Sequence, residues 1–328
     1  MRFSVDPWDP SYGASLDTEL GESEAETTVD VECPPERWRP LDPDPAVRAP
    51  ATVLFVDGIR RVDAQLWVEE RPGEASPALC GSWAAGVVCC CPDGAHLGGA
   101  DVRRGLFTSA PGAADVVTAA GAYTAHRLEP GKAAGAGQRL SAALQAALRR
   151  TELEVALAAR ERRACRTDAD DDLLVLDGSV QGRQHLPRTV GFTKTHSQTY
   201  LPATLGGIVA RLDTGQRTPV FRIDGPWRRH TWYLRLPCAP AGPWAGVVRV
   251  ECSADLPVAE AVALAARSQV TLVRYASAEY KDSRAPQNLY PIAGLERALR
   301  RRLGEQALLY RALRRSASDV TTVTPMPA

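Results

Sequence analysis

Two aspartates follow short apolar runs, in the stretches VLFVDG (53–58) and LLVLDG (173–178). Apolar runs without polar alternation are typical of strands that are covered on both faces, as in the centre of an α/β sheet. Ligands bind outside the carboxyl ends of the strands in such sheets. If the two strands are neighbours, Asp57 and Asp177 converge, and two like charges that close need a cation between them. The alternative at each position is an ordinary Asp-Gly turn.

A long helix that carries two glutamates is predicted between these strands. Residues 139–164 contain no Gly or Pro, and their apolar stripe comprises Leu140, Leu144, Leu148, Val155 and Ala159. Glu152 and Glu154 flank this stripe on opposite sides, each about 80° from its centre at 100° per residue. Helical geometry alone therefore leaves open which of the two glutamates faces the aspartates.

Carboxylates from two central strands and a crossing helix form an arrangement that holds divalent metal ions in nucleases. Their hard oxygen ligands suit Mg²⁺ or Mn²⁺. Two such ions, about 4 Å apart, activate a water and stabilise the leaving oxygen of a phosphodiester. The order Asp, Glu, Asp along the chain therefore favours metal-dependent phosphodiester hydrolysis.

The remaining patterns predict an α/β fold with a mixed central sheet flanked by helices. Strands are expected at residues 51–57, 61–70, 82–91, 122–128, 173–177, 190–195, 218–223, 230–236 and 245–252, the first two paired as a hairpin. Helices are expected at 139–164, 255–269 and 294–315, and Gly304 is expected to interrupt the last one.

The 328 residues suffice for one large domain or two modest ones. Residues 1–50 are rich in Pro, Asp and Glu, and residues 1–45 hold twelve acidic side chains against three arginines. This composition predicts an N-terminal arm that is extended or folds only against a partner surface. We expect residues 51–315 to form the main domain and 316–328 a flexible tail.

Basic residues are concentrated in two later segments. The formal net charge is zero, so the net −9 of residues 1–45 is balanced by +9 in the rest of the chain. Arginines cluster in 217–235 and 295–315, which suits contacts to phosphates. A solvated helix face is the alternative. The candidate DNA contacts are Arg60, Arg228, Arg229 and Arg300.

Composition also predicts the compartment. No run of 18 or more apolar residues is present, and the N-terminus lacks an apolar segment behind a basic start, so neither a membrane span nor a secretory signal is expected. The eight cysteines show no CxxC spacing, and three of them are adjacent in GVVCCC (86–91). Adjacent cysteines on a strand alternate between its faces and are poor disulfide partners. We therefore expect buried thiols in a reducing cytoplasm.

These features together resemble the NurA nucleases, a family with an RNase H-like (Piwi-like) core. The matching stretches are, in order, VLFVDGIRRVDAQLW, RTELEVALAA, LLVLDGSV, VGFTKTH and KDSRAPQNLYPIAGLE, between residues 51 and 310. The resemblance implies a homodimeric 5′–3′ exonuclease and endonuclease for DNA that depends on Mn²⁺ or Mg²⁺. It also implies a hexameric HerA/FtsK-type translocase as partner in DNA double-strand-break end resection, a step of DNA repair.

The resemblance assigns roles to individual residues. Asp57 and Asp177 match the family's two strand aspartates, and Glu152, in the pattern Arg-x-x-Glu-Leu, matches its helix glutamate. These three are the expected metal ligands, with Glu154 as the reserve. Lys194, one of only three lysines, matches the lysine after the second acidic strand and could reach a scissile phosphate as a point charge. An ordinary exposed lysine is the alternative.

One departure concerns the last helix. Many members of the family carry a histidine there as a further metal or phosphate contact, whereas LERALRRR (295–302) has none. His196 could supply an imidazole, although a surface histidine is the simpler interpretation. Asp282 or Glu296 could instead furnish the last oxygen ligand.

Three other classes of protein compete with the nuclease hypothesis. The missing histidine favours a non-catalytic DNA-binding or scaffolding subunit, which a failure to bind Mn²⁺ would support. A nucleotide-using enzyme such as a sugar-kinase-like ATPase needs a glycine-rich phosphate loop, and no GxxxxGK[ST] is present. A phosphatase with DxD after its first strand is disfavoured, because Gly58 and Ile59 follow Asp57.

Overall fold

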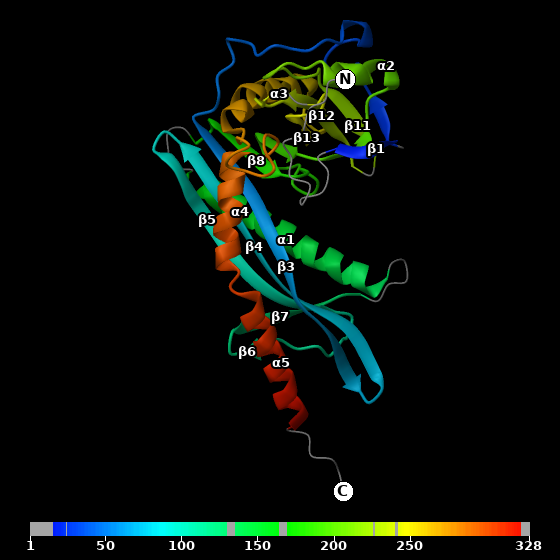
Figure 1. The fold of residues 1–328 in the computed structure, drawn as a ribbon, viewed down its shortest axis with the longest axis vertical. Coiled ribbons are helices and arrows are strands. Elements are labelled where there is room, and N and C mark those ends of the chain that lie inside the picture. The colour runs from blue at the N-terminus through cyan, green and yellow to red at the C-terminus, as the bar shows by residue number, and fades with distance from the viewer. Residues whose placement is uncertain are drawn as a thin grey trace. The chain divides into compact units, whose positions relative to one another are not determined.

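The computed structural model describes residues 16–23, 25–129, 135–163, 169–225, 227–239 and 242–322. The chain divides into two compact units. Unit 1 contains the chain up to residue 56 together with 88–96 and 162–294, and unit 2 contains 57–87, 97–161 and the chain from 295 onward. Three long strands run from one unit into the other: β3 (Thr52–Arg71), β4 (Glu74–Cys91) and β5 (Gly94–Thr108) (Figure 1).

Unit 1 is built on a mixed sheet with the strand order β2-β11-β12-β13-β9-β8-β3. Strand β8 is parallel to both β3 and β9, and the pairs from β9 to β2 are antiparallel. The remaining strands of this sheet are β2 (Glu26–Thr28), β8 (Asp172–Asp177), β9 (Thr189–Thr193), β11 (Phe221–Asp224), β12 (Arg229–Arg235) and β13 (Val247–Ser253). A separate two-stranded sheet pairs β1 (Leu16–Glu22) with β10 (His196–Thr199).

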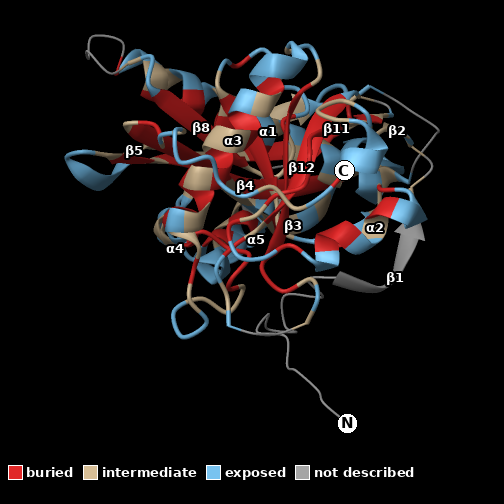
Figure 2. Ribbon diagram, turned by 90° about the horizontal axis from the view of Figure 1, so that it is seen from above, coloured by how far each residue is buried: buried red, intermediate tan, exposed pale blue. Residues whose placement is uncertain are grey.

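Both faces of the unit 1 sheet are covered, as its apolar strands predict. Along β12, Trp232 and Leu234 pack on one face against α3 (Val258–Leu272). Tyr233 packs on the other face, where α2 (Ala203–Ala210) covers the sheet. Figure 2 shows these central strands in the red of buried residues. Two short 3₁₀ helices, Pro35–Arg37 and Val273–Tyr275, complete the unit.

Unit 2 has the strand order β3-β4-β5-β7-β6, with β7 parallel to β5 and antiparallel to β6. Its further elements are β6 (Val116–Thr118), β7 (Gly121–Arg127), α1 (Ala136–Glu161), α5 (Gln306–Thr322) and the part of α4 (Tyr290–Arg302) from residue 295 onward. Helix α1 packs on one face of β4, where the indole Nε1 of Trp83 donates a hydrogen bond of 2.9 Å to Oγ1 of Thr151. Leu313 of α5 joins the core that contains Cys80 of β4. The predicted class, α/β with a mixed sheet flanked by helices, is thereby confirmed.

The predicted hairpin between residues 51–57 and 61–70 is wrong, because β3 continues without interruption through Gly58. The turn follows later, at Gly73, whose φ is +80°. Asp57 therefore lies inside a strand. Of the two predicted Asp-Gly turns, the one at the end of β8 is present, where Gly178 has a φ of +101°.

Most of the other predicted elements are present. Helix α1 covers most of residues 139–164, and Gly304, with a φ of +78°, separates α4 from α5 as predicted. Helix α2 was not expected from the sequence. Its eight residues include Gly206 and Gly207, which weaken any helical signal.

The described part of the N-terminal arm packs on its own chain. Strand β2 pairs with β11, and Trp38 is buried against Phe221. Glu32 accepts a hydrogen bond of 2.7 Å from Nη1 of Arg217. This differs from the expectation of an arm that folds only against a partner. Residues 316–322 of the predicted tail are helical in α5, and 323–328 lie outside the described residues. The boundaries 1–50, 51–315 and 316–328 stay predictions.

Candidate metal centre

Asp57, the first predicted ligand, directly follows the stretch of β3 that is paired within unit 1. Strands β3 and β8 are parallel, and their register runs from Thr52 opposite Asp172 to Val56 opposite Leu176. Asp57 and Asp177 are the next residues of these two strands. The side chain of Asp57 is buried, with 7% of the residue exposed. Its Oδ1 accepts a hydrogen bond of 2.7 Å from the backbone N–H of Gly58.

The structure separates the two candidate glutamates of α1. Glu152 is buried at 6% exposure and approaches Gly58 so closely that a Cβ at position 58 would lie 2.7 Å from its Oε1. Glu154 points elsewhere. Its side chain is 44% exposed and its Oε2 lies 2.6 Å from Nη2 of Arg103. Within unit 2, Glu152 is therefore the helix glutamate that lies next to Gly58, the residue after Asp57.

A third acid of unit 2 comes from α4. One carboxylate oxygen of Glu296 lies within 4.8 Å of a carboxylate oxygen of Asp57. Glu296 follows Leu295, one of the buried residues that recur on the packed face of α4, and 9% of the residue is exposed. Nη2 of Arg300, one turn later, lies 3.9 Å from its Oε2. Of the two substitutes proposed for the missing histidine, Glu296 is the one near Asp57.

Asp177 belongs to a polar network within unit 1. Its Oδ2 accepts a hydrogen bond of 2.6 Å from Nζ of Lys194, and the two side chains are 14% and 11% exposed. The same ammonium group donates to Oδ1 of Asn288 at 3.2 Å. Nδ2 of Asn288 in turn donates to Oδ2 of Asp282 at 2.7 Å. Lys194 is thus an ion-pair partner of Asp177 and not an ordinary exposed lysine. Asp282 lies one step further along this network.

His196 has a structural environment. It is buried, its Nε2 is 3.0 Å from the carbonyl oxygen of Val247, and its ring packs against Tyr233 and Trp244. Burial lowers the pKa of this imidazole to about 4. The expectation of a surface histidine is therefore wrong, because the aromatic cluster of unit 1 encloses the ring.

The four candidate DNA-binding arginines differ in environment. Arg60, Arg228 and Arg300 are exposed, and Nε of Arg60 donates a hydrogen bond of 2.7 Å to Gln145. Arg229 is buried, with its Nε 3.3 Å from Glu251 and its guanidinium over the ring of Tyr200. This burial is a correction to the prediction for Arg229, which shares the buried carboxylate of Glu251 with Arg249.

The donor set fits a hard divalent cation. Three buried carboxylates of unit 2, on Asp57, Glu152 and Glu296, are the oxygen ligands that Mg²⁺ and Mn²⁺ take. Ligand oxygens on opposite sides of a Mg²⁺ ion are about 4 Å apart, so the oxygens of Asp57 and Glu296, which lie within 4.8 Å of each other, need only a small adjustment. Without a cation or a proton, carboxylates this close repel each other.

Comparisons with known proteins were made for the whole chain. No family model matches it, and no curated protein matches it. Among solved structures, the chain is similar to the NurA nuclease from Sulfolobus solfataricus over 89% of its own length and 90% of that chain, with 12% sequence identity and a TM-score of 0.44. Within the described ranges, no helix has the length and apolar composition to cross a membrane. At this identity and TM-score, the case for function rests on the residues themselves.

Proposed function

We propose that this protein is a metal-dependent nuclease that hydrolyses phosphodiester bonds in DNA. The observation that carries the proposal is the convergence of buried acids at one point of β3. Glu152 of α1 and Glu296 of α4 both approach the segment Asp57–Gly58. Stability alone gives no reason to bury several carboxylates together, because each loses hydration and repels the others.

Asp57, Glu152 and Glu296 of unit 2 would hold one or two divalent ions. Asp177 of unit 1 is the further ligand that the resemblance to NurA nucleases implies. The support for Asp177 is the register of unit 1, in which the preceding residues Val56 and Leu176 are paired. Bound Mn²⁺ or Mg²⁺ supplies an activated water and charge stabilisation at the leaving oxygen. The chain's own part is to fix the carboxylates in position and to keep bulk water away from them.

Lys194 would orient the substrate in this scheme. Its ammonium group bonds Asp177 and Asn288, which hold it in place without burying it fully. A lysine held in this way can donate a hydrogen bond to a non-bridging phosphate oxygen. Its charge would also offset part of the negative charge of the phosphodiester.

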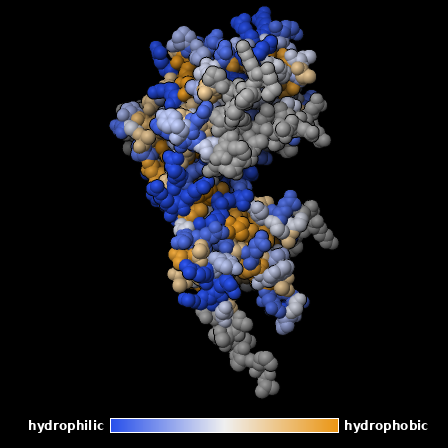
Figure 3. Space-filling model, viewed as in Figure 1, coloured by the Kyte–Doolittle hydropathy of each residue, from blue (hydrophilic) through white to orange (hydrophobic). Residues whose placement is uncertain are grey.

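The DNA backbone would lie along the arginines of α4. Arg297, Arg300, Arg301 and Arg302 are all exposed, on the helix that also carries Glu296. Figure 3 shows hydrophilic side chains along the visible face that carries α4. Arginines in consecutive turns suit contacts to successive phosphates, so binding would depend on charge more than on base sequence.

The more specific parts of the proposal come from the resemblance to NurA nucleases. They are a homodimeric state, a hexameric HerA/FtsK-type translocase as partner, and a role in double-strand-break end resection. Size-exclusion chromatography with light scattering tests the homodimer, since a mass near 35.3 kDa, that of one chain, would contradict it.

The decisive experiment compares Asp57→Asn with Glu154→Gln on end-labelled linear DNA in Mn²⁺. Asp57→Asn keeps the shape of the side chain and removes its charge, so we expect it to abolish cleavage while DNA binding, measured without divalent metal, is retained. Glu154→Gln changes an exposed acid of the same unit and should cleave like the wild type. Full cleavage by Asp57→Asn would overturn the site. A wild-type protein that binds DNA and never cleaves it would favour the scaffolding alternative.

A further inference from the structure

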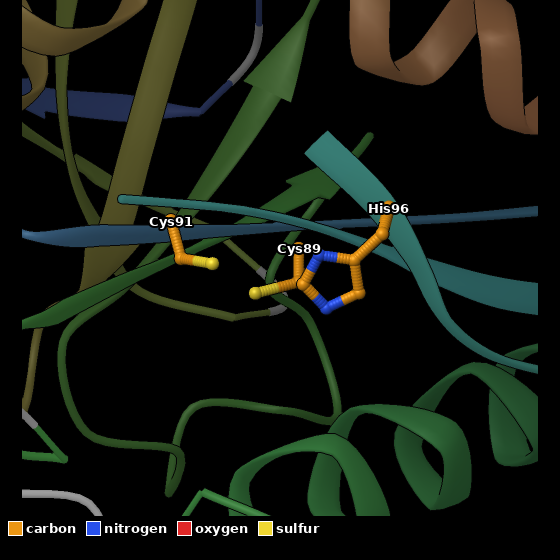
Figure 4. A group of neighbouring side chains, drawn as sticks. All are labelled: Cys89, Cys91 and His96. Carbon is orange, nitrogen blue, oxygen red and sulfur yellow. The ribbon is translucent and has the colours of Figure 1, made fainter. Parts of the chain in front are cut away.

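The tip of the β4–β5 hairpin carries a second group of possible metal ligands, and all of it lies in unit 1. Cys89 and Cys91 come from the end of β4, and His96 from the start of β5. One ligand atom of each residue lies within 4.8 Å of the other two. Figure 4 shows the two sulfur atoms turned toward each other, with the imidazole beside Cys89.

The local backbone explains this convergence. Residues two apart on a strand point to the same face, so Cys89 and Cys91 share a face while Cys90 points into the core of unit 1. The turn has two residues, Pro92 and Asp93, followed by Gly94 with a φ of +106°. Proline and a left-handed glycine stabilise such a tight turn. Cys89 thus stands three positions before Pro92, and His96 three positions after Asp93.

The surroundings add polar and charged groups suited to a thiolate centre. Sγ of Cys91 lies 3.9 Å from Oδ2 of Asp93 and 3.6 Å from the carbonyl oxygen of Gly94. Nη1 of the buried Arg163 donates to Sγ of Cys89 at 3.8 Å. Burial raises the pKa of the Cys89 thiol, as does the neighbouring Cys91, and Arg163 opposes the rise. A guanidinium here would offset part of the negative charge of the thiolates.

We propose that Cys89, Cys91 and His96 bind one Zn²⁺ ion, with the carboxylate of Asp93 or a water as the fourth ligand. Two sulfurs and one imidazole nitrogen are the donors that Zn²⁺ prefers, and they are soft compared with the oxygen-rich acid cluster. The ion replaces the protons of both thiols, which are released to solvent. The site is therefore chemically distinct from a Mg²⁺ or Mn²⁺ site.

The distances suit such an ion. Zn–S bonds of about 2.3 Å and Zn–N bonds of about 2.0 Å in a tetrahedron place the ligand atoms about 3.5–3.8 Å apart. The group needs to contract by about 1 Å from its upper limit of 4.8 Å. His96 is exposed and Cys91 half-buried, so rotation of these two side chains can provide the contraction. The bound ion would fasten the tip of the hairpin.

A disulfide between Cys89 and Cys91 is the competing use of these thiols. Residues two apart on an extended strand have Cα atoms about 6.6 Å apart, near the upper end of the range that disulfides tolerate. A bond there would close a very small ring and would leave His96 without a role. The position of His96 beside the two sulfurs therefore favours the metal.

The test is a titration of the full-length, reduced, metal-free protein with Co²⁺, which substitutes for Zn²⁺ and absorbs light through thiolate-to-metal charge transfer. We expect one Co²⁺ per chain with this band, and Zn²⁺ should displace the Co²⁺. The double variant Cys89→Ser/Cys91→Ser should lose the band. His96→Ala, at an exposed position, should weaken Zn²⁺ binding by at least about 10-fold, the lower end of the effect of losing an outer-shell partner.

Cys33→Ser is the matched control, because Cys33 is a partly exposed free cysteine of the same unit outside the hairpin. Cys33→Ser should keep the band. Asp57→Asn should keep it as well, which would show that the band does not depend on the acid cluster. Circular dichroism verifies that each variant is folded. Absence of the band in the wild type, or its persistence in the double variant, would overturn the proposal. A Cys89–Cys91 disulfide that on reduction yields a protein without Zn²⁺ affinity would overturn it as well.

Discussion

Glu152 and Gly58 are in direct contact in unit 2: the glycine leaves room for the carboxylate, since a Cβ at position 58 would lie 2.7 Å from Oε1 of Glu152 and 2.5 Å from Cδ1 of Leu148. Gly58 follows Asp57 in the middle of β3. A glycine inside a strand costs stability and often marks a close approach by another group. Here the group that approaches is an acid, which ties the geometry of α1 to the proposed site.

The first prediction separates the two glutamates of α1. Glu152→Gln should reduce Mn²⁺-dependent DNA cleavage by about 100-fold or more, because removal of a metal ligand takes away several kcal/mol of transition-state stabilisation. Glu154→Gln should cleave within a few-fold of the wild type, since it loses only a half-exposed ion pair with Arg103. The measurement is single-turnover cleavage of labelled DNA. If Glu154→Gln lost more cleavage activity than Glu152→Gln, Glu154 would be the metal ligand.

The second prediction concerns Gly58→Ala. The methyl group should displace the carboxylate of Glu152, while the flexible ends of Glu152 and Leu148 absorb most of the steric cost. Activity should therefore fall by about 100-fold, as expected for a misplacement of about 1 Å. The midpoint of thermal unfolding should change little. Gly73→Ala at the hairpin turn is the control, since it strains a residue with φ of +80° and its added methyl group would meet no atom within 4 Å. A fully active Gly58→Ala would argue against Glu152 as a ligand.

The third prediction concerns the ion pair of Lys194 with Asp177. Lys194→Met should destabilise the metal-free protein by about 3 kcal/mol, because it leaves a largely buried carboxylate without its cation. If Asp177 is a metal ligand, Mn²⁺ should restore part of this stability, and more in the variant than in the wild type. Chemical denaturation with and without Mn²⁺ measures both effects. Equal metal stabilisation of the two proteins would count against Asp177 as a ligand.

The fourth prediction addresses the DNA-binding face. Arg300→Ala/Arg301→Ala should weaken DNA binding about equally for unrelated sequences. The slope of log K against log salt should become shallower by about 1.8 for duplex DNA, at about 0.9 for each phosphate that is no longer neutralised. Arg71→Ala is the control, because Arg71 is an exposed arginine of the same unit at the β3–β4 turn. An unchanged slope in the double variant would remove α4 from the proposed interface.

The fifth prediction uses the buried histidine. His196 has a pKa lowered to about 4 from its ordinary 6.5, so between these values the unfolded chain binds more protons than the folded one. Stability should therefore fall as pH falls from 6.5 to 4, by about 3 kcal/mol in total from this residue. His196→Asn can still donate to the carbonyl of Val247 and does not titrate. The pH dependence of its unfolding free energy should be flatter than that of the wild type by this amount, and equal curves would contradict the assignment.

The sequence located the acidic strands, because uninterrupted apolar runs such as 53–56 and 173–176 are typical of strands covered on both faces. It also located α1 and the break at Gly304 from helical periodicity and glycine. The prediction that a strand ends at Asp57–Gly58 was wrong, because the pairing of β3 overrides the local turn preference of Asp-Gly.

Sequence periodicity could not choose between Glu152 and Glu154, which flank the same apolar stripe at equal angles, and packing of α1 on β3 made the choice. Nor could it decide between Asp282 and Glu296 as the further ligand beside Asp57, or connect Cys89 with His96. Asp57 and Glu296 are separated by more than 200 residues, and the proximity of Cys89 and His96 depends on a turn that brings two strands together. Residue types and strand ends are local properties that a sequence determines by itself. Which acids share a pocket depends on contacts distant in the chain, and only the tertiary structure decides it.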